Sequence, residues 1–195
     1  KETITLKDHQ KAGNYTKAKL LVNHFEIIFS TFIVLVWTIG GAMNWLDVFW
    51  SQRITNPILM GTTFIVSIML IASFIDLPFS IYRNFVLEQK FGFNRMTAKT
   101  FIADLIKEIL LTLILMIPLI YAILYLMNIS SIGDYWWIYV WVIISLFTLT
   151  MMWIYPSFIA PIFNKFNPLD NDALKSRINN LLERTGFGSD GIFVM

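Results

Sequence analysis

The chain's two histidines, His9 and His24, are the first residues to consider for metal chemistry. A zinc peptidase can hold its metal with two imidazoles one helical turn apart, in an HExxH pattern whose Glu acts as general base. Here the histidines are fifteen residues apart, and neither is followed directly by Glu. The sequence therefore offers no metal ligands and no catalytic residue of this kind.

Nucleophilic chemistry is equally poorly represented. The chain has no Cys, which excludes thiolate metal sites and Cys nucleophiles. Several serines lie in or near apolar segments without a histidine at a suggestive spacing: Ser30, Ser67, Ser73, Ser145 and Ser157. Such serines usually bond back to the preceding helical turn. There is also no phosphate-binding glycine loop, and no nucleic-acid partner is expected.

Asp76 is the ionisable residue that stands out, because it lies at the end of a long apolar segment. A charge at that depth in a membrane normally faces protein or water, and it is a candidate for function. Arg83 follows seven residues later on nearly the same helical face, as a candidate partner. A structural ion pair is the conservative interpretation. Aspartyl chemistry lacks a second carboxylate, since Asp47 and Asp134 lie towards the opposite membrane face.

The elements that would position these residues are membrane spans. The chain is 56% hydrophobic and only 14% charged. Four stretches of at least 20 residues lack Asp, Glu, Lys and Arg: Ile27–Leu46, Ile54–Ile75, Ile109–Gly133 and Tyr135–Asn164. About 20 helical residues cross a hydrocarbon core, where backbone polar groups need internal partners. The sequence therefore predicts an all-α, multi-pass protein with four spans; four helices buried in a soluble core are the less favoured alternative.

Basic residues predict the orientation. Of the 15 Lys and Arg residues, only Arg53 lies outside three regions: the N-terminal segment, the loop over residues 80–108 and the segment after the fourth span. Basic loops stay in the cytoplasm, so these three regions are placed there. The expected organisation is a polar helix over 1–24, a membrane domain over 25–164 that includes the loop, and a third part over 165–195.

The loop contains Glu88-Gln89-Lys90-Phe91-Gly92-Phe93-Asn94-Arg95. Gly92 lies between two aromatic residues and predicts a tight turn with positive φ, which glycine accepts at little steric cost. Thr97 is expected to cap the helix that follows. On physical grounds alone, this loop is a helical hairpin at the membrane surface, with its aromatic rings in the interface.

The stretch from Tyr155 to Leu169 closes the last apolar run with three prolines, which allow no ordinary uninterrupted helix. An amphipathic helix is then predicted over Asp172–Arg184, with Gly186 as its left-handed cap. Gly191–Met195 begins an apolar, strand-like run. These pieces cannot bury their faces alone. The chain is therefore expected to be truncated at the start of a soluble α/β domain.

The loop around Gly92 and the proline-rich exit resemble, in the same order, two segments of the type 1 CAAX prenyl protease family. Members of that family are membrane zinc metallopeptidases. The resemblance implies four of the family's spans here, a further span before Lys1, and a zinc-binding domain that begins over residues 165–195. Zinc would belong to the full-length parent, whose HExxH motif lies beyond this chain. The chain alone is then expected to be inactive.

The resemblance also implies an enclosed chamber and a peptide that reaches zinc near the cytoplasmic face. The residues expected to shape or support its mouth are Asp76, Arg83, Glu88, Phe91, Gly92, Phe93, Asn94, Tyr155, Pro156, Pro161 and Asn164. Expected partners are the lipid bilayer, a peptide or protein substrate with or without a lipid group, and the missing catalytic domain. The location would be the bacterial inner membrane or the endoplasmic reticulum, depending on the source.

A non-catalytic membrane scaffold or a transporter fragment is the alternative. It is supported by the absence of catalytic chemistry in these 195 residues and by prolines such as Pro118 and Pro156, because kinked helices suit transporters. Against it, transporter sites usually need polar or broken helices at mid-membrane. Transport predicts that this chain binds a ligand alone, whereas the peptidase interpretation does not.

Overall fold

The structure, a computed structural model, describes residues 6–164, 166–187 and 191–194. It divides into two compact units, residues 1–136 and 137–195, which are described separately. Within the described residues, four helices are long and apolar enough to cross a membrane: His9–Thr38, Pro57–Phe91, Ala98–Asn128 and Gly133–Phe163. The multi-pass helical prediction is confirmed at this level.

The first unit begins with α1 (Leu6–Thr38), in which the polar N-terminal segment and the first span form one helix. At Gly40 a Cβ atom would lie 2.5 Å from the carbonyl oxygen of Val36, and Gly41 adopts a φ of 80°. This glycine pair ends α1, and α2 (Ala42–Ser51) starts directly after it. The charge-free run Ile27–Leu46 therefore extends past the end of α1, because apolar composition continues through the helix break.

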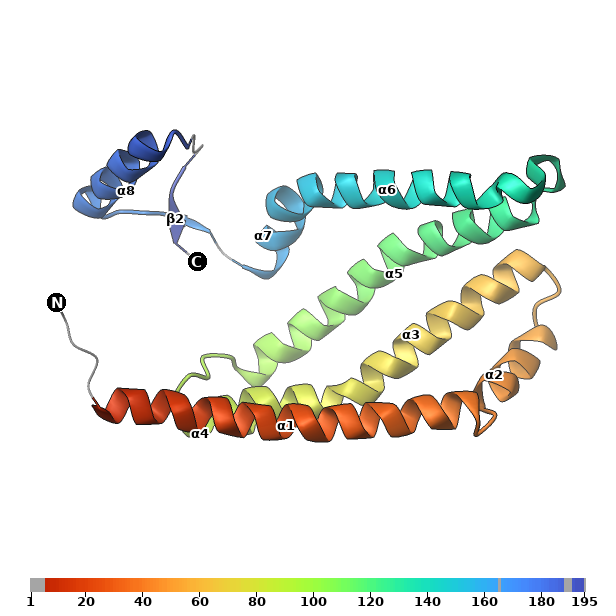
Figure 1. Cartoon of the computed structure of the whole chain (residues 1–195), viewed down its shortest axis with the longest axis horizontal. Coiled ribbons are helices and arrows are strands. Elements are labelled where there is room, and N and C mark those ends of the chain that lie inside the picture. Colours follow the sequence, from red (N-terminus) through yellow and green to blue (C-terminus); the bar gives the residue numbers. More distant parts are fainter. Residues whose placement is uncertain (1–5, 165, 188–190, 195) are drawn as a thin grey trace. The chain divides into compact units, whose positions relative to one another are not determined.

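The short helix α2 turns the chain back into α3 (Pro57–Tyr82), as Figure 1 shows. Leu46 is buried, and the indole nitrogen of Trp50 donates a hydrogen bond to the Ser67 hydroxyl at 3.0 Å. The side-chain oxygen of Asn56 caps α3 by accepting from two backbone N–H groups, and Pro57 follows as the first helical residue. These contacts fasten the turn on this side of the first unit.

The helix that contains the second span continues past residue 80, the predicted start of the cytoplasmic loop. After α3 the chain continues as a π-helical segment, η1 (Arg83–Leu87), and then as α4 (Glu88–Phe91). Pro78 lies inside α3 and lacks a backbone donor, so one helical hydrogen bond is missing there. The wider π turn follows five residues later, where the Glu88 N–H bonds to the Arg83 carbonyl. Only residues 92–97 of the predicted loop are non-helical before the next helix.

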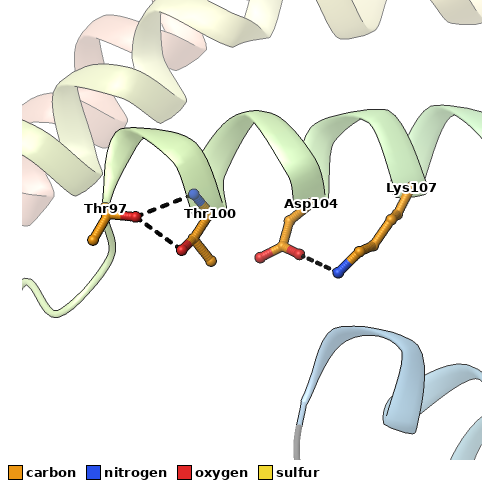
Figure 2. Close-up of polar contacts among 4 residues, drawn as sticks. All are labelled: Thr97, Thr100, Asp104 and Lys107. Carbon is orange, nitrogen blue, oxygen red and sulfur yellow. Dashed lines mark hydrogen bonds and ion pairs between the residues drawn. The ribbon is translucent and has the colours of Figure 1, made fainter.

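That next helix is α5 (Ala98–Asn128), and its cap is the predicted one. The Thr97 hydroxyl accepts a hydrogen bond from the Thr100 backbone N–H at 3.2 Å, and Asp104 pairs with Lys107 at 3.0 Å further along the helix (Figure 2). Helix α5 packs along α3. A Cβ atom at Gly61 would lie 2.9 Å from a methyl carbon of Leu124, so the glycine permits this close approach.

The first unit ends with the 3-10 turn η2 (Ser130–Tyr135), and α6 (Trp136–Ile154) continues into the second unit. Helix α6 passes into a second π-helical segment, η3 (Tyr155–Ile159), and a short α7 (Ala160–Phe163). The Ala160 N–H bonds to the Tyr155 carbonyl five residues back, and the backbone leaves helical geometry at Asn164. The predicted interruption at the prolines is confirmed as a widened turn.

After Asn164, the short strand β1 (Asn167–Pro168) pairs antiparallel with β2 (Phe193–Val194). Between them lies α8 (Asp172–Thr185), whose first turn is capped by the Asn171 side chain. Gly186 ends α8 with a φ of 69°, which confirms the predicted left-handed cap. The strand-like run is also present, although Met195 lies outside the described residues.

Gly92 provides a direct stability test, because it ends α4 with a φ of 74°. We expect Gly92→Ala to lower the thermal unfolding midpoint in detergent, since an L residue in the left-handed region costs about 1–2 kcal/mol. Gly13→Ala is the matched control: Gly13 lies within α1 with no atom within 4 Å of its Cβ position, and alanine there favours the helix by about 1 kcal/mol. Equal midpoints for the two variants would contradict the assigned turn.

Candidate functional site

The aromatic turn after α4 lies against the N-terminal part of α1. Tyr15 of α1 makes edge contacts with both rings of the turn, at 5.4 Å to Phe91 and 5.1 Å to Phe93 between ring centroids. The Lys11 ammonium lies 4.9 Å from the centre of the Phe93 ring. Edge contacts and cation–π contacts of this kind each contribute about 0.5–1.5 kcal/mol. The turn is therefore held by α1, a contact that the sequence did not indicate.

The backbone of the turn is built by residues on the predicted site list. The Glu88 carbonyl accepts from the Phe93 N–H at 2.9 Å and from the Asn94 N–H at 3.3 Å. The Asn94 side-chain oxygen accepts in turn from the Met96 N–H at 2.7 Å. Glu88, Gly92 and Asn94 thus act locally, by shaping the chain between α4 and α5.

Arg83 forms an ion pair with Glu26, not with Asp76. Its guanidinium donates a hydrogen bond to Glu26 Oε2 at 2.7 Å, and the two side chains are 35% and 22% exposed. The predicted Asp76–Arg83 partnership is therefore wrong. Seven residues rise about 10 Å along a helix, so a shared face does not bring these two side chains together. Glu26 lies directly across on α1, and the pair ties that helix to η1.

Asp76 instead lines a groove between α1 and α3 with a volume of about 340 Å³. Ser30 and Thr38 contribute hydroxyl groups to the same groove, and most of the remaining lining is apolar. Asp76 is exposed and has no ion pair with another residue that the structure describes. The carboxylate thus lies beside protein at the edge of the second span, as expected for an ionisable group in a membrane helix.

A second carboxylate at this level, Glu108, was missed by the sequence analysis. It lines a cavity of about 140 Å³ between α3 and α5, together with Ser73 and Thr112. The Gly61–Leu124 contact fixes the antiparallel register of the two helices, which brings Glu108 to the level of Asp76. The two carboxylates line different cavities, Glu108 between α3 and α5 and Asp76 between α1 and α3. The signal was available, since Glu108 directly precedes the third apolar run.

The remaining predicted site residues lie in the second unit. Tyr155 and Pro156 belong to η3, Pro161 lies in α7, and the Asn164 N–H bonds to the Ala160 carbonyl at 3.0 Å. Tyr155 is 60% exposed. These four residues lie around one helix exit, and the other seven predicted residues belong to the first unit.

The part of the chain that the structure describes contains no group of three His, Cys, Asp or Glu side chains able to hold a metal ion. Both histidines lie on α1, and His24 Nδ1 is 2.6 Å from the Leu20 carbonyl oxygen of its own helix. The described residues therefore do not fit a zinc site. The chemistry they provide is structural: helix packing, one interhelical ion pair and a braced turn.

Residues 1–165 match the family profile described as "CAAX prenyl protease N-terminal, five membrane helices". This chain belongs to the CAAX prenyl protease family. A CAAX prenyl protease 1 homologue from Dictyostelium discoideum is 34% identical over 205 residues, which cover 100% of this chain and 47% of that protein. A homologue from Caenorhabditis elegans is 31% identical over 195 residues, covering 100% of this chain and 43% of its own length. The predicted family resemblance is confirmed.

The fold matches as well. The crystal structure of S. mikatae Ste24p aligns with a TM-score of 0.85 at 31% identity, over 99% of this chain and 46% of that chain. The membrane-helical fold is therefore similar to that of Ste24p. The chain spans less than half the length of these relatives.

The Glu26–Arg83 pair can be tested by charge exchange. We expect Arg83→Gln and Glu26→Gln each to lower the unfolding free energy in detergent by about 1–2 kcal/mol, because each leaves a partly buried charge without its oppositely charged partner. The exchanged pair, Glu26→Arg with Arg83→Glu, should recover most of that loss. Arg95→Gln is the matched control, since Arg95 is exposed and lies outside the pair. An exchanged pair no more stable than the single variants would contradict the contact.

Proposed function

We propose that this chain is the membrane part of a zinc-dependent endopeptidase that cuts peptides near the cytoplasmic membrane face. The observation that carries the proposal is the family match over residues 1–165, joined to the Ste24p fold over 99% of the chain. The relatives are named as CAAX prenyl proteases, so a prenylated C-terminal peptide is the proposed substrate class. We propose the same substrate class for this protein as for these relatives.

The proposed zinc would be held outside this chain, because the residues described here do not fit a metal site. No catalytic step is therefore assigned to these side chains, and the chain alone is proposed to be inactive. Its contribution would be to bind the bilayer, to wall the path of the peptide and to hold the catalytic domain at the membrane. Positioning of this kind has large effects, because small displacements of reacting groups slow a reaction strongly.

The proposed organisation follows from charge and local structure. The N-terminus, the loop over residues 80–108 and the C-terminal segment are placed in the cytoplasm, because they hold all Lys and Arg residues except Arg53. Residues 1–24 would be the cytoplasmic polar segment and residues 25–164 the membrane domain, and α1 joins the two within Leu6–Thr38. Residues 165–195 would begin the soluble catalytic domain, a proposal supported by the pairing of β1 with β2 around α8.

The cytoplasmic mouth of the chamber is assigned to two groups of residues. In the first unit, the Glu26–Arg83 pair and the braced turn around Gly92 would fix the ends of three helices. In the second unit, the widened turn at Tyr155–Ile159 would set the angle at which the chain leaves the membrane. Asp76 would face the aqueous part of the path, since it is exposed in a groove between two spans.

The groove that contains Asp76 also favours the second candidate, a transporter fragment or a scaffold. The groove is lined by one carboxylate and two hydroxyl groups in an otherwise mostly apolar wall, which would suit a polar solute. Transport predicts saturable ligand binding by this chain without any catalytic domain. The peptidase proposal predicts no such binding.

Metal removal tests the peptidase proposal. In the full-length protein, we expect a zinc chelator to abolish cleavage of a prenylated C-terminal peptide, and added zinc to restore it, because hydrolysis depends on the metal. The same chelator should leave the unfolding midpoint of the 195-residue chain unchanged. Full cleavage in the presence of chelator would contradict zinc dependence. A change in the unfolding midpoint of the 195-residue chain on adding chelator would contradict the proposal that the metal is bound outside this chain.

The proposed mouth is tested by alanine substitution in the full-length protein. We expect Arg83→Ala and Asp76→Ala each to lower kcat/KM for peptide cleavage by about tenfold. The first removes the ion pair that positions the helices at the proposed mouth, and the second removes a negative charge from the path of the peptide. Asp47→Ala is the control, since Asp47 is an exposed carboxylate of α2 and is placed at the opposite membrane face. Unchanged assembly and cleavage in both variants would remove Asp76 and Arg83 from the site.

A further inference from the structure

The cavity that Glu108 lines lies between two candidate spans, α3 and α5, and has a volume of about 140 Å³. Its polar lining consists of the Glu108 carboxylate and the Ser73 and Thr112 hydroxyl groups. The rest of its wall is aliphatic or methionine side chains. Pockets for whole small ligands usually measure about 300–1,000 Å³, so this cavity suits a single side chain.

Helix α5 has a polar face and an apolar face. Asp104, Glu108 and Thr112 recur every four residues and therefore share one face. Two residues turn an α-helix by about 200°, which puts Ile106 and Leu110 on the opposite face. There they are 53% and 54% exposed. Because ionisable groups in a membrane face protein or water, the exposed apolar face suits lipid and the face of Glu108 suits the aqueous path.

Helix α3 shows the same division. Ser73 lies three residues before Asp76 and shares its face, whereas Phe74 lies on the other side and is 61% exposed. Ser73 and Thr112 line the same cavity, so the polar faces of the two helices meet there.

The three polar groups of the cavity have no partner within the protein. The Thr62 and Ser67 hydroxyls of α3 donate to the backbone carbonyl four residues earlier, as is usual in membrane helices. The Ser73 and Thr112 hydroxyls make no hydrogen bond to any residue whose position the structure describes. Glu108 is exposed and forms no ion pair within the same part of the chain. The cavity therefore offers three oxygen acceptors.

We propose that this cavity binds a lysine side chain of the peptide substrate, with its ammonium at Glu108 and its stem along the apolar wall. A lysine ammonium has three N–H donors and no acceptor, which matches one carboxylate and two hydroxyl oxygens. Lysine stems commonly cover apolar surface while the charged end stays in polar surroundings. Glu108 thus sets specificity and takes no part in the chemical step.

This inference rests on the proposed function, because it needs a peptide that passes these spans. An exposed ion pair strengthens binding by at most about fivefold. The charge on the bound lysine does not change during hydrolysis, so the pair stabilises the bound substrate and the transition state equally. The preference for lysine is therefore expected in KM and not in kcat.

Thiol labelling of the full-length protein in nanodiscs tests the orientation of the cavity without using cleavage. This chain has no Cys, so a single introduced Cys is read against the unsubstituted protein. We expect Thr112→Cys to react with a membrane-impermeant maleimide much faster than Ile114→Cys, whose position is 67% exposed on the apolar face. Thr112→Cys reacting no faster than Ile114→Cys would overturn the aqueous orientation.

Paired peptides test the ligand. The probes are prenylated C-terminal peptides in which one lysine replaces glutamine at successive positions. At one position we expect the lysine peptide to have about fivefold lower KM with the same kcat, and to protect Thr112→Cys from labelling at about fivefold lower concentration. Glu108→Gln should remove both preferences, and Thr112→Val, which removes one acceptor, should weaken the KM preference. Asp47→Asn is the matched control, since Asp47 is an exposed carboxylate of α2.

Two results would overturn the lysine pocket: no preference for lysine at any position, or a preference that survives both Glu108→Gln and Thr112→Val. Equal protection of Thr112→Cys by the lysine and glutamine peptides would overturn it as well, and would leave the cavity to water. Selective protection by the lysine peptide without cleavage of either peptide would support the pocket and contradict the peptidase proposal. Failure of the pocket and failure of the proposed function are therefore distinguishable.

Discussion

Backbone hydrogen bonding in hydrocarbon is the constraint on which the rest of this structure depends. No water is present there to satisfy a free N–H or C=O group, so the chain crosses as helices whose polar groups bond internally. A proline within a span conflicts with this constraint, because it lacks a backbone N–H group and so leaves one carbonyl without its helical donor. Around Pro156 the chain stays helical by widening into the π turn η3, and a second π turn, η1, begins five residues after Pro78, which itself lies within α3. Both widened turns carry residues of the candidate site.

The first unit is fixed at the end where α4 turns into α5 by contacts that α1 makes with distant segments. Glu26 binds Arg83 of η1, and Tyr15 packs on both rings of the turn after α4. The long polar extension of α1 therefore stabilises η1 and the turn after α4, although its sequence alone predicts an ordinary solvated helix. The groove that contains Asp76 also lies along this helix. The placement of α1 therefore decides the shape of the proposed chamber mouth.

The sequence predicted features whose causes are local, and it missed those that depend on distant partners. Gly92 and Thr97 were assigned correctly because positive φ and N-terminal capping are set within a few residues. The Glu26–Arg83 pair joins residues 57 positions apart, which spacing within one helix cannot reveal. That spacing predicted Asp76 as the partner of Arg83 instead. The break at Gly40–Gly41 was hidden because apolar composition shows the depth of a chain in a bilayer, not where a helix ends. The domain boundaries and the roles of the site residues stay predictions.

The central claim is that these helices are the membrane half of a zinc peptidase whose metal is bound by residues outside the chain. The family match and the Ste24p fold cover the chain but less than half of its relatives. The most direct measurement is the sequence of the encoding gene beyond the Met195 codon. The account predicts an HExxH helix downstream, with a distal Glu as third protein ligand. A stop codon directly after Met195 would contradict it and favour a membrane scaffold without its own chemistry.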